Sequence, residues 1–238
     1  MAHILSIIIP IYNEEDNIMR LEDALLKYID IALIPIKVLF VNDGSTDSSQ
    51  KLIDTICKRH SSFNYLLFTE NFGLSAAIKA GFDYVDTDLV GYMDADLQTS
   101  PNDFNLLIEH IDNYDLVTGV RINRKDGLSK LISSKIANSF RRLFTRDGMD
   151  DTGCPLKLLK TTYAKRIPMF KGLHRFLPAM ILLQEGTIKQ VPVQHFPRVA
   201  GKSKFGFWNR SIGPFLDCFV YAWMKKKYIN YIVSKTDI

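Results

Sequence analysis

Tyr92-Met93-Asp94-Ala95-Asp96-Leu97-Gln98 is the stretch of this 238-residue chain that decides the expected fold. It closes the apolar run 88–93, which predicts a buried strand. Alternate residues of an extended chain point the same way, so Asp94 and Asp96 can face one point where the strand ends. Two carboxylates suit Mg2+ or Mn2+, which complete their coordination with water and phosphate oxygens. Asp-X-Asp is a common pair, and a solvated acidic loop is the alternative.

The first half of the chain alternates expected strands with expected helices. Apolar runs predict strands at 4–9, 36–41, 63–68, 88–93 and 115–119, and a further strand is expected in the second half at 188–193. Apolar residues at helical spacing predict helices at 14–29, after 47, at 73–85 and at 101–111. This alternation predicts an α/β fold with a mostly parallel sheet and helices on both faces. The Gly-X-Gly-X-X-Gly and P-loop patterns are absent from the sequence, which argues against a dinucleotide-dependent dehydrogenase and a P-loop enzyme.

Polar loops follow four of the expected strands. They are Pro10-Ile11-Tyr12-Asn13-Glu14, Asn42-Asp43-Gly44-Ser45, Asn71-Phe72-Gly73 and Asp94-Ala95-Asp96. In an open α/β sheet the carboxyl ends of the strands are where ligands bind. Together the loops can surround a nucleotide whose diphosphate meets a metal ion. Each loop taken alone is explained equally well by turn and capping chemistry.

Composition supports a globular protein with two differently charged halves. Hydrophobic residues make up 47% and charged residues 24% of the chain. Residues 1–120 hold 19 acidic and 7 basic side chains, whereas residues 121–238 hold 7 acidic and 23 basic ones. This asymmetry predicts an anionic ligand for the second half. The three cysteines are far apart, which favours a reducing compartment, and the sequence shows neither a signal peptide nor a run of 18 apolar residues.

The segment 121–146 carries the densest positive charge. It holds eight basic side chains and one acid, Asp126, and apolar residues recur at helical spacing through it. A basic amphipathic helix beside a catalytic site suits a phosphate on an apolar tail. A solvated basic face is the alternative, and a nucleic-acid partner is not expected because no nucleic-acid-binding motif is present.

The loop motifs, taken in order, resemble the inverting family-2 glycosyltransferases of the GT-A fold. The motifs that carry this resemblance are Pro10-Ile11-Tyr12-Asn13-Glu14, Val41-Asn42-Asp43-Gly44-Ser45-Thr46-Asp47, Asn71-Phe72-Gly73 and Met93-Asp94-Ala95-Asp96-Leu97-Gln98. Motifs in the second half resemble the dolichol-phosphate mannose synthase and polyprenyl-phosphate glycosyltransferase group: Gly119-Val120-Arg121, Ser134-Lys135-Ile136-Ala137-Asn138, Asp151-Thr152-Gly153-Cys154-Pro155-Leu156-Lys157 and Arg198-Val199-Ala200-Gly201-Lys202-Ser203-Lys204. The resemblance runs from about residue 4 to residue 210.

The resemblance implies a role for each matching position. The nucleotide sugar would contact Pro10, Tyr12, Glu14, Asn42, Asp43, Asn71, Gly73 and Asp94. Asp94, Asp96 and Gln98 would hold Mg2+ or Mn2+. The lipid phosphate would meet Arg121, Lys135, Arg198, Lys202, Ser203 and Lys204, and the catalytic set would be Asp96, Arg121, Lys135 and Arg198. Asn42 stands where many relatives have Asp, and Lys135 stands where Arg is common, which keeps the charge but loses bidentate geometry.

Residues 1–204 are therefore expected to form the catalytic domain, and residues 205–238 a basic, amphipathic segment at the membrane interface. Phe205 to Met224 is aromatic and apolar but is interrupted by Arg210 and Asp217, and Lys225-Lys226-Lys227 follows. We expect it to attach the protein peripherally to the cytoplasmic face of a membrane. The alternative is a helix packed on the domain or on a second subunit, and a homo-oligomer is possible.

The expected reaction moves a hexose of the mannose or glucose type from a GDP- or UDP-linked donor to a polyprenyl phosphate, dolichyl or undecaprenyl. Such an acceptor is already anionic and needs no general base, so neither His174 nor His195 is assigned as a catalyst. The first alternative is a family-2 enzyme acting on a sugar hydroxyl in polysaccharide or lipopolysaccharide synthesis, which needs a carboxylate base. The second is a membrane-peripheral binding protein that kept the fold without the activity.

Overall fold

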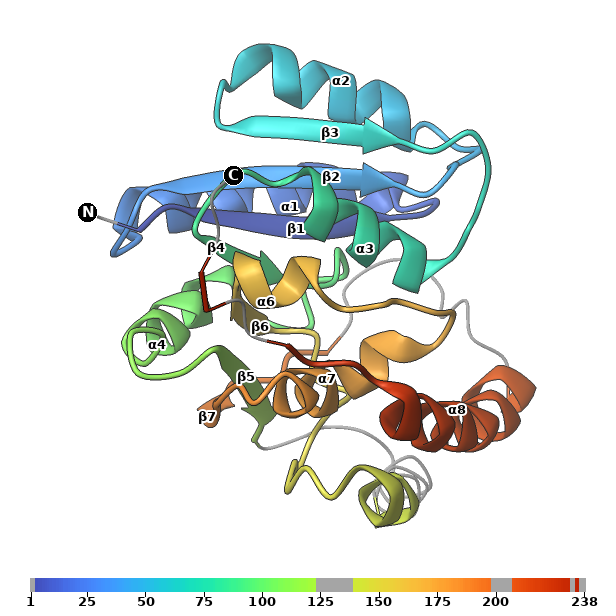
Figure 1. Cartoon of the computed structure of the whole chain (residues 1–238). Helices are drawn as coiled ribbons and strands as arrows, with labels where there is room; N and C mark the ends of the chain where they lie inside the picture. Colours follow the sequence, from blue (N-terminus) through green and yellow to red (C-terminus); the bar gives the residue numbers. More distant parts are fainter. Residues whose placement is uncertain (1–2, 123–138, 198–206, 232–233, 236–238) are drawn as a thin grey trace.

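The computed structural model describes residues 3–122, 139–197, 207–231 and 234–235. Within these residues seven strands form one sheet in the order β3-β2-β1-β4-β6-β5-β7 (Figure 1). The strands are β1 (Leu5–Ile11), β2 (Ile36–Asn42), β3 (Phe63–Leu67), β4 (Leu89–Tyr92), β5 (Leu116–Arg121), β6 (Lys157–Lys160) and β7 (Ile188–Val193). The expected strands are all present, and β6 is an additional strand that we did not expect.

Parallel pairing dominates the sheet and confirms the expected α/β class. β1 pairs in parallel with both β2 and β4, and β2 pairs in parallel with β3. β6 runs antiparallel to both of its neighbours, β4 and β5, while β5 and β7 are parallel. The carboxyl ends of β1, β2, β3 and β4 therefore lie at one edge of the sheet, where the polar loops leave it.

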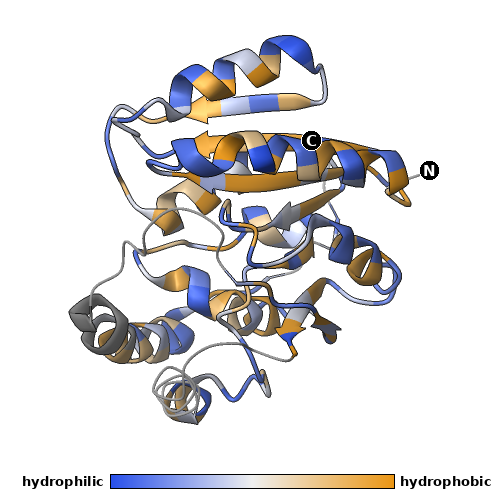
Figure 2. Cartoon of the chain, turned by 180° about the vertical axis from the view of Figure 1, so that it is seen from behind, coloured by the Kyte–Doolittle hydropathy of each residue, from blue (hydrophilic) through white to orange (hydrophobic). Residues whose placement is uncertain are grey.

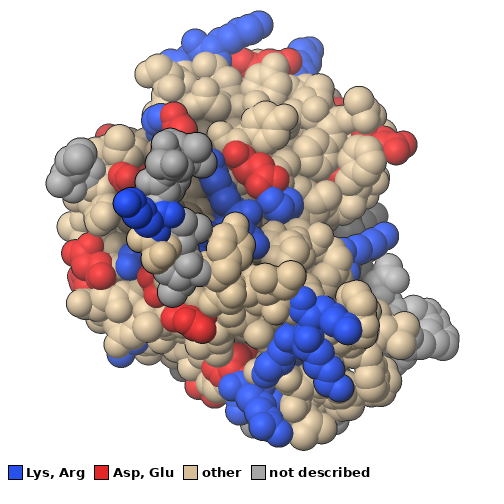
Figure 3. Space-filling model, in the orientation of Figure 1, with Lys and Arg blue, Asp and Glu red and all other residues tan. Residues whose placement is uncertain are grey.

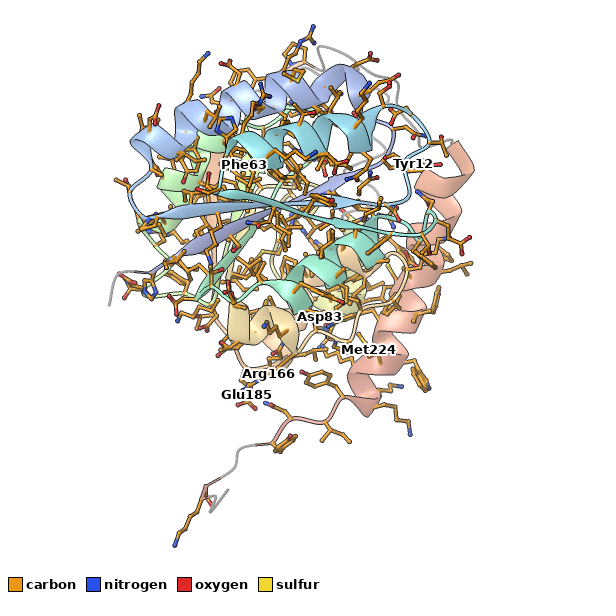
Figure 4. The ribbon with its side chains drawn as sticks, turned by 90° about the horizontal axis from the view of Figure 1, so that it is seen from above. Tyr12, Phe63, Asp83, Arg166, Glu185 and Met224 are labelled. Carbon is orange, nitrogen blue, oxygen red and sulfur yellow. The ribbon has the colours of Figure 1, made fainter. Side chains whose placement is uncertain are left out.

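Helices cover both faces of the sheet (Figures 2 and 4). Ile7 and Ile9 of β1 face one layer, whereas Ile8 between them faces the other, as the two-residue repeat of a strand requires. The first layer contains α1 (Glu15–Ile31), α2 (Ser49–Arg59), the short 3-10 turn η1 (Pro101–Asp103) and α4 (Phe104–Ile108). The second contains α3 (Leu74–Tyr84), α6 (Thr161–Lys165), η2 (Leu173–Phe176), α7 (Leu177–Leu183) and α8 (Phe207–Lys227).

The C-terminal segment forms one continuous helix, in which Arg210 and Asp217 interrupt the apolar run but not the helix itself. α8 spans 21 residues and includes Gly213-Pro214. One side of it packs on the second layer, where Cys218 and Tyr221 are buried and the Tyr221 ring stacks on Phe176 with centroids 5.3 Å apart. In the part of the chain that the structure describes, α8 and the other helices are all too short or too polar to cross a membrane.

The contact between α3 and β1 generates a stability prediction. Gly81 of α3 lies directly over Ile8, and a Cβ at this position would come within 2.5 Å of the Ile8 side chain. Because Ile8 is fully buried and cannot move away freely, Gly81→Ala should lower the free energy of unfolding by about 1–3 kcal/mol. Urea denaturation followed by circular dichroism measures this loss.

Gly213→Ala is the matched control, since Gly213 is also helical but a Cβ there meets no atom within 4 Å. It should change the free energy of unfolding by less than about 1 kcal/mol, because the higher helix propensity of alanine is opposed by the restriction that Pro214 places on the residue before it. Equal effects of the two substitutions would contradict the packing argument.

Candidate functional site

A cleft of about 620 Å³ opens at the carboxyl edge of the parallel strands. The loops after β1, β2, β3 and β4 form one side, and residues 171–175 with α8 form the other. Figure 4 shows Tyr12 at this edge of the sheet. The lining includes eight residues expected from the sequence: Pro10, Tyr12, Glu14, Asp43, Asn71, Gly73, Asp94 and Asp96.

Asp94 and Asp96 meet in this cleft directly after β4. The Tyr92 hydroxyl donates to Asp94 Oδ1 at 2.7 Å, and the Gln98 backbone N–H donates to Asp96 Oδ1 at 3.1 Å. Leu97 between them has a φ of +54°, an uncommon value for a residue with a branched side chain. The turn that aims the two carboxylates is therefore held in a conformation that costs free energy.

Electrostatics at the carboxylate pair favour a bound cation. Burial raises the pKa of Asp94 to about 6, the charge of Asp96 adds to the rise, and the hydrogen bond from Tyr92 opposes it. A divalent cation would relieve the repulsion between two ionised carboxylates. The described residues contain no group of three or more His, Cys, Asp or Glu side chains suited to a metal, so water and donor phosphates would complete the shell. The pair thus fits Mg2+ or Mn2+ held jointly with a substrate.

Asp43 organises the loop that follows β3. Its Oδ1 accepts from the Phe72 N–H at 2.7 Å, and its Oδ2 accepts from the Gly73 N–H at 2.9 Å and from Asn71 Nδ2 at 3.0 Å. Burial raises the pKa of Asp43, and the two backbone N–H groups oppose that rise. Gly73 has a φ of +93°, which glycine adopts readily. Asp43 therefore shapes the cleft as well as facing it.

The structure places Asn42 and Gln98 outside the cleft lining. Asn42 is fully buried, its Nδ2 donates to Gln50 at 2.7 Å, and its Oδ1 accepts from the Ser45 N–H at 2.9 Å. Gln98 accepts at its backbone oxygen from the Phe196 N–H at 2.9 Å, and its side-chain nitrogen lies 3.5 Å from the Phe196 oxygen. Asn42 holds the turn after β2, and Gln98 ties the acidic loop to the chain that follows β7.

Arg121 is the member of the expected phosphate-binding set that the structure describes. Its Nε and a terminal nitrogen donate to the two oxygens of Asp151 at 2.7 and 2.9 Å, a bidentate ion pair at the end of β5. Arg121 does not line the cleft, although its charge contributes to lowering the pKa of Asp94. The other expected members, Lys135, Arg198, Lys202, Ser203 and Lys204, lie outside the described residues.

The far side of the cleft was not expected from the sequence. It consists of Lys171, Gly172, His174, Arg175, Gly213 and Asp217, with Ser75 of α3 beside them. Arg175 donates to Asp217 of α8 at 3.3 Å, and the Ser75 hydroxyl lies 2.8 Å from His174 Nδ1. These residues come from three distant segments of the chain, so no local motif could have revealed them.

Comparisons with known proteins agree with this geometry. Residues 6–166 match the family described as glycosyl transferase family 2. The chain is 30% identical over 204 residues to an undecaprenyl-phosphate 4-deoxy-4-formamido-L-arabinose transferase from Edwardsiella ictaluri, and 31% identical over 209 residues to the enzyme of that name from Klebsiella pneumoniae. Each match covers 85% of this chain and 63% of the relative, so the chain spans less than two thirds of these relatives' length.

Solved structures share the fold at low sequence identity. Glucosyl-3-phosphoglycerate synthase from Mycobacterium tuberculosis, in complex with Mn2+, UDP and glucosyl-3-phosphoglycerate, gives a TM-score of 0.70 at 11% identity and covers 96% of this chain and 81% of its own. A mannosyltransferase from Pyrobaculum calidifontis in complex with GDP-Man and Mn2+ gives 0.67 at 16% identity, covering 94% and 65%. These likenesses confirm the GT-A fold. With the family match over residues 6–166, they lead to one conclusion: the chain belongs to glycosyl transferase family 2.

Proposed function

We propose that this chain transfers a sugar from a nucleotide diphosphate sugar to the phosphate of a polyprenyl lipid. The nucleotide occupies the side of the cleft formed by Pro10, Tyr12, Glu14, Asp43 and the Asn71–Gly73 loop. Asp94 and Asp96 would hold Mg2+ or Mn2+, and the positive charge of such an ion would stabilise the leaving diphosphate. The names of the curated relatives, which specify undecaprenyl phosphate as acceptor, support this proposal.

In the proposed reaction an oxygen of the acceptor phosphate forms a bond to the anomeric carbon. The bond from that carbon to the diphosphate oxygen breaks, and the nucleoside diphosphate leaves with the electron pair, inverting the configuration. The phosphate oxygen is already anionic, so no side chain has to remove a proton. We propose that Arg121 and the basic residues Lys135, Arg198, Lys202 and Lys204, with Ser203, bind the acceptor phosphate, although only Arg121 lies in the described residues.

The main structural support for a lipid acceptor is the position of α8. Gly213 and Asp217 on one side of this helix line the cleft. Large apolar side chains on its other side are exposed to solvent, and they are Phe215, Leu216, Phe219, Val220 and Trp223. An apolar tail can therefore lie along α8 while its phosphate reaches the cleft.

The expected hexose is not supported by the curated relatives, whose names specify an L-arabinose derivative. The solved neighbours of the fold carry UDP-linked glucose and GDP-linked mannose, but their identity to this chain is too low to transfer a substrate.

One observation favours the alternative in which the acceptor is a sugar hydroxyl. Asp217 lines the cleft, and its carboxylate could take a proton from a sugar alcohol. Burial raises the pKa of Asp217, which suits a group that takes up a proton, and the ion pair with Arg175 opposes that rise. Transfer from a panel of labelled UDP- and GDP-sugars should therefore be assayed with undecaprenyl phosphate and, separately, with soluble sugar acceptors. Product that extracts into organic solvent only when the lipid is present is the expected result. Transfer to the soluble acceptors alone would establish the alternative.

Loss of the Asp96 carboxylate should stop transfer without unfolding the protein. We expect Asp96→Asn to lower the transfer rate by about 100-fold or more, since a charge facing the reacting diphosphate is lost. The paramagnetic resonance of Mn2+ should show weaker binding, while the free energy of unfolding changes by less than about 1 kcal/mol.

Asp86→Asn is the control for Asp96→Asn, because Asp86 is an exposed carboxylate paired with Lys37 at 3.3 Å near the opposite edge of the sheet. It should change neither Mn2+ binding nor transfer. Normal activity of Asp96→Asn would contradict the metal role, and absence of both transfer and donor hydrolysis in the unsubstituted protein would favour the non-catalytic alternative.

We further propose that the exposed side of α8 rests on an anionic membrane surface. The exposed apolar surface of α8 continues onto a neighbouring helical segment through Leu143, which is also exposed. Aromatic rings join this segment to α8: the ring centroids of Phe140 and Phe215 are 4.4 Å apart, and those of Phe144 and Phe219 are 5.1 Å apart. Lys225, Lys226 and Lys227 follow, and Figure 3 shows basic side chains gathered where α8 ends. An apolar face next to basic residues is typical of interfacial helices.

Replacing Lys225, Lys226 and Lys227 with Gln should weaken binding to anionic vesicles about 100-fold, since each lysine contributes about 1 kcal/mol at such a surface. Co-sedimentation with vesicles of anionic and of zwitterionic lipid measures this, and added salt should weaken binding of the unsubstituted protein. Replacing the exposed Lys27, Lys51 and Lys58 with Gln makes the same charge change on α1 and α2 and should have little effect. Equal losses in both triple variants, or no vesicle binding at low salt, would exclude this docking face.

A further inference from the structure

The far side of the cleft contains a polar wall that the proposed reaction does not yet use. We define the polar wall as Ser75, Gly172, His174, Arg175 and Asp217. It combines the first turn of α3, the segment leading into α7 and the middle of α8. It shares one cavity with the carboxylate pair Asp94 and Asp96, which is where the donor diphosphate is placed. In a nucleotide sugar the group attached to the diphosphate is the sugar.

His174 is held in one orientation by α3. The Ser75 hydroxyl oxygen accepts from the Gly172 N–H at 3.0 Å and lies 2.8 Å from His174 Nδ1. Among the described residues we find no hydrogen-bond partner for the other ring nitrogen, Nε2. His174 lines the cleft and is partly exposed there, so Nε2 is available to a ligand.

The charge of His174 suits a neutral ligand. Burial lowers the pKa of His174 to about 3, and the positive charges of Arg175 and Lys157 lower it further. The ring is therefore uncharged near neutral pH, and an uncharged imidazole is a hydrogen-bonding group rather than a phosphate-binding cation.

Arg175 and Asp217 form the second half of the wall. Their ion pair, at 3.3 Å, is partly exposed to the cleft. Asp217 packs against Gly172, where a Cβ would come within 2.2 Å of the carboxylate and where φ is +96°. The pair presents guanidinium donors beside carboxylate acceptors, and adjacent sugar hydroxyls require both kinds of partner. A carboxylate and an uncharged imidazole are poor partners for another phosphate.

We propose that His174 and the Arg175–Asp217 pair bind the hydroxyl groups of the donor's sugar and decide which nucleotide sugar is accepted. This inference rests on the proposed function, since it assumes that a nucleotide sugar occupies the cleft. A site built to hydrogen-bond a hydroxyl rejects analogues that lack it, because its buried polar groups are then left without partners. Selectivity among sugars therefore resides in the polar wall, whereas affinity for the nucleotide resides in the opposite loops.

Calorimetric titration separates the two contributions. UDP, GDP and a panel of their glucose, galactose, mannose, xylose and L-arabinose conjugates are titrated in Mn2+ into the unsubstituted protein, His174→Ala and Arg175→Ala. We expect UDP or GDP to bind all three proteins within twofold. The preferred nucleotide sugar should bind His174→Ala at least about threefold, and Arg175→Ala at least about tenfold, more weakly, as expected for losing a neutral and a charged hydrogen bond.

Two further variants distinguish a loss of sugar contacts from a general disturbance of the structure. Arg175→Lys keeps the charge but loses the planar fork, so it should bind UDP or GDP normally and still lose discrimination among the sugars. Asp217→Asn should weaken sugar-dependent affinity, whereas Asp86→Asn, from the Lys37–Asp86 pair of equal length at 3.3 Å, should not.

The inference is overturned if the variants keep the sugar preference, if they lose affinity for the nucleotide and the nucleotide sugar equally, or if the unsubstituted protein shows no sugar-dependent gain with any conjugate. Failure of the unsubstituted protein to bind either UDP or GDP would instead overturn the proposed function.

Discussion

Parallel pairing of β1 with both β2 and β4 is the constraint on which the rest of the structure depends. It brings the ends of these strands to one edge, so that residues far apart in sequence, such as Tyr12, Asp43 and Asp94, line one cleft. The fully buried isoleucines of β1 hold this arrangement by filling both helical layers alternately. A shift of β1 by one residue would exchange Ile8 with its neighbours and move every loop relative to the carboxylate pair.

The carboxylate pair in the cleft lies next to buried polar and charged side chains. The Tyr92 hydroxyl donates a hydrogen bond to Asp94. The ammonium group of Lys157 is almost fully buried and lies 6.0 Å from the centroid of the Tyr92 ring. Burial lowers the pKa of Lys157, but its nitrogen donates to the backbone oxygens of Cys154 and Thr152, which offsets part of the cost of burial. The antiparallel strand β6 places Lys157 there. This unexpected strand thus supplies a positive charge below the two carboxylates.

The sequence predicted the strands that have a clear apolar pattern. It missed the short strand β6 and the residues that meet only after folding. Runs such as Ile4 to Ile9, which is apolar except for Ser6, became strands. β6 is four residues long and begins and ends with lysine, so its pattern resembles a surface loop. Loop residues after the strands line the cleft because the parallel sheet determines where they go, and their roles there stay predictions. Asn42 was placed there by analogy, yet its amide is used within its own turn. Ser75, His174 and Asp217 meet only after folding.

The two sides of α8 lead to a consequence for how this sequence can vary. Asp217, Cys218 and Tyr221 face the protein, whereas Leu216, Val220 and Trp223 face outward on the same turns. Neighbouring positions such as 216 and 217 therefore lie in different environments. Position 216 faces the outside of the molecule, whereas position 217 faces the cleft. In a set of natural variants the outward positions are free to exchange one apolar residue for another, while the inward ones must change together with their partners on α7 and η2. Adaptation to a new surface and adaptation to a new substrate can thus proceed on one helix without interfering with each other.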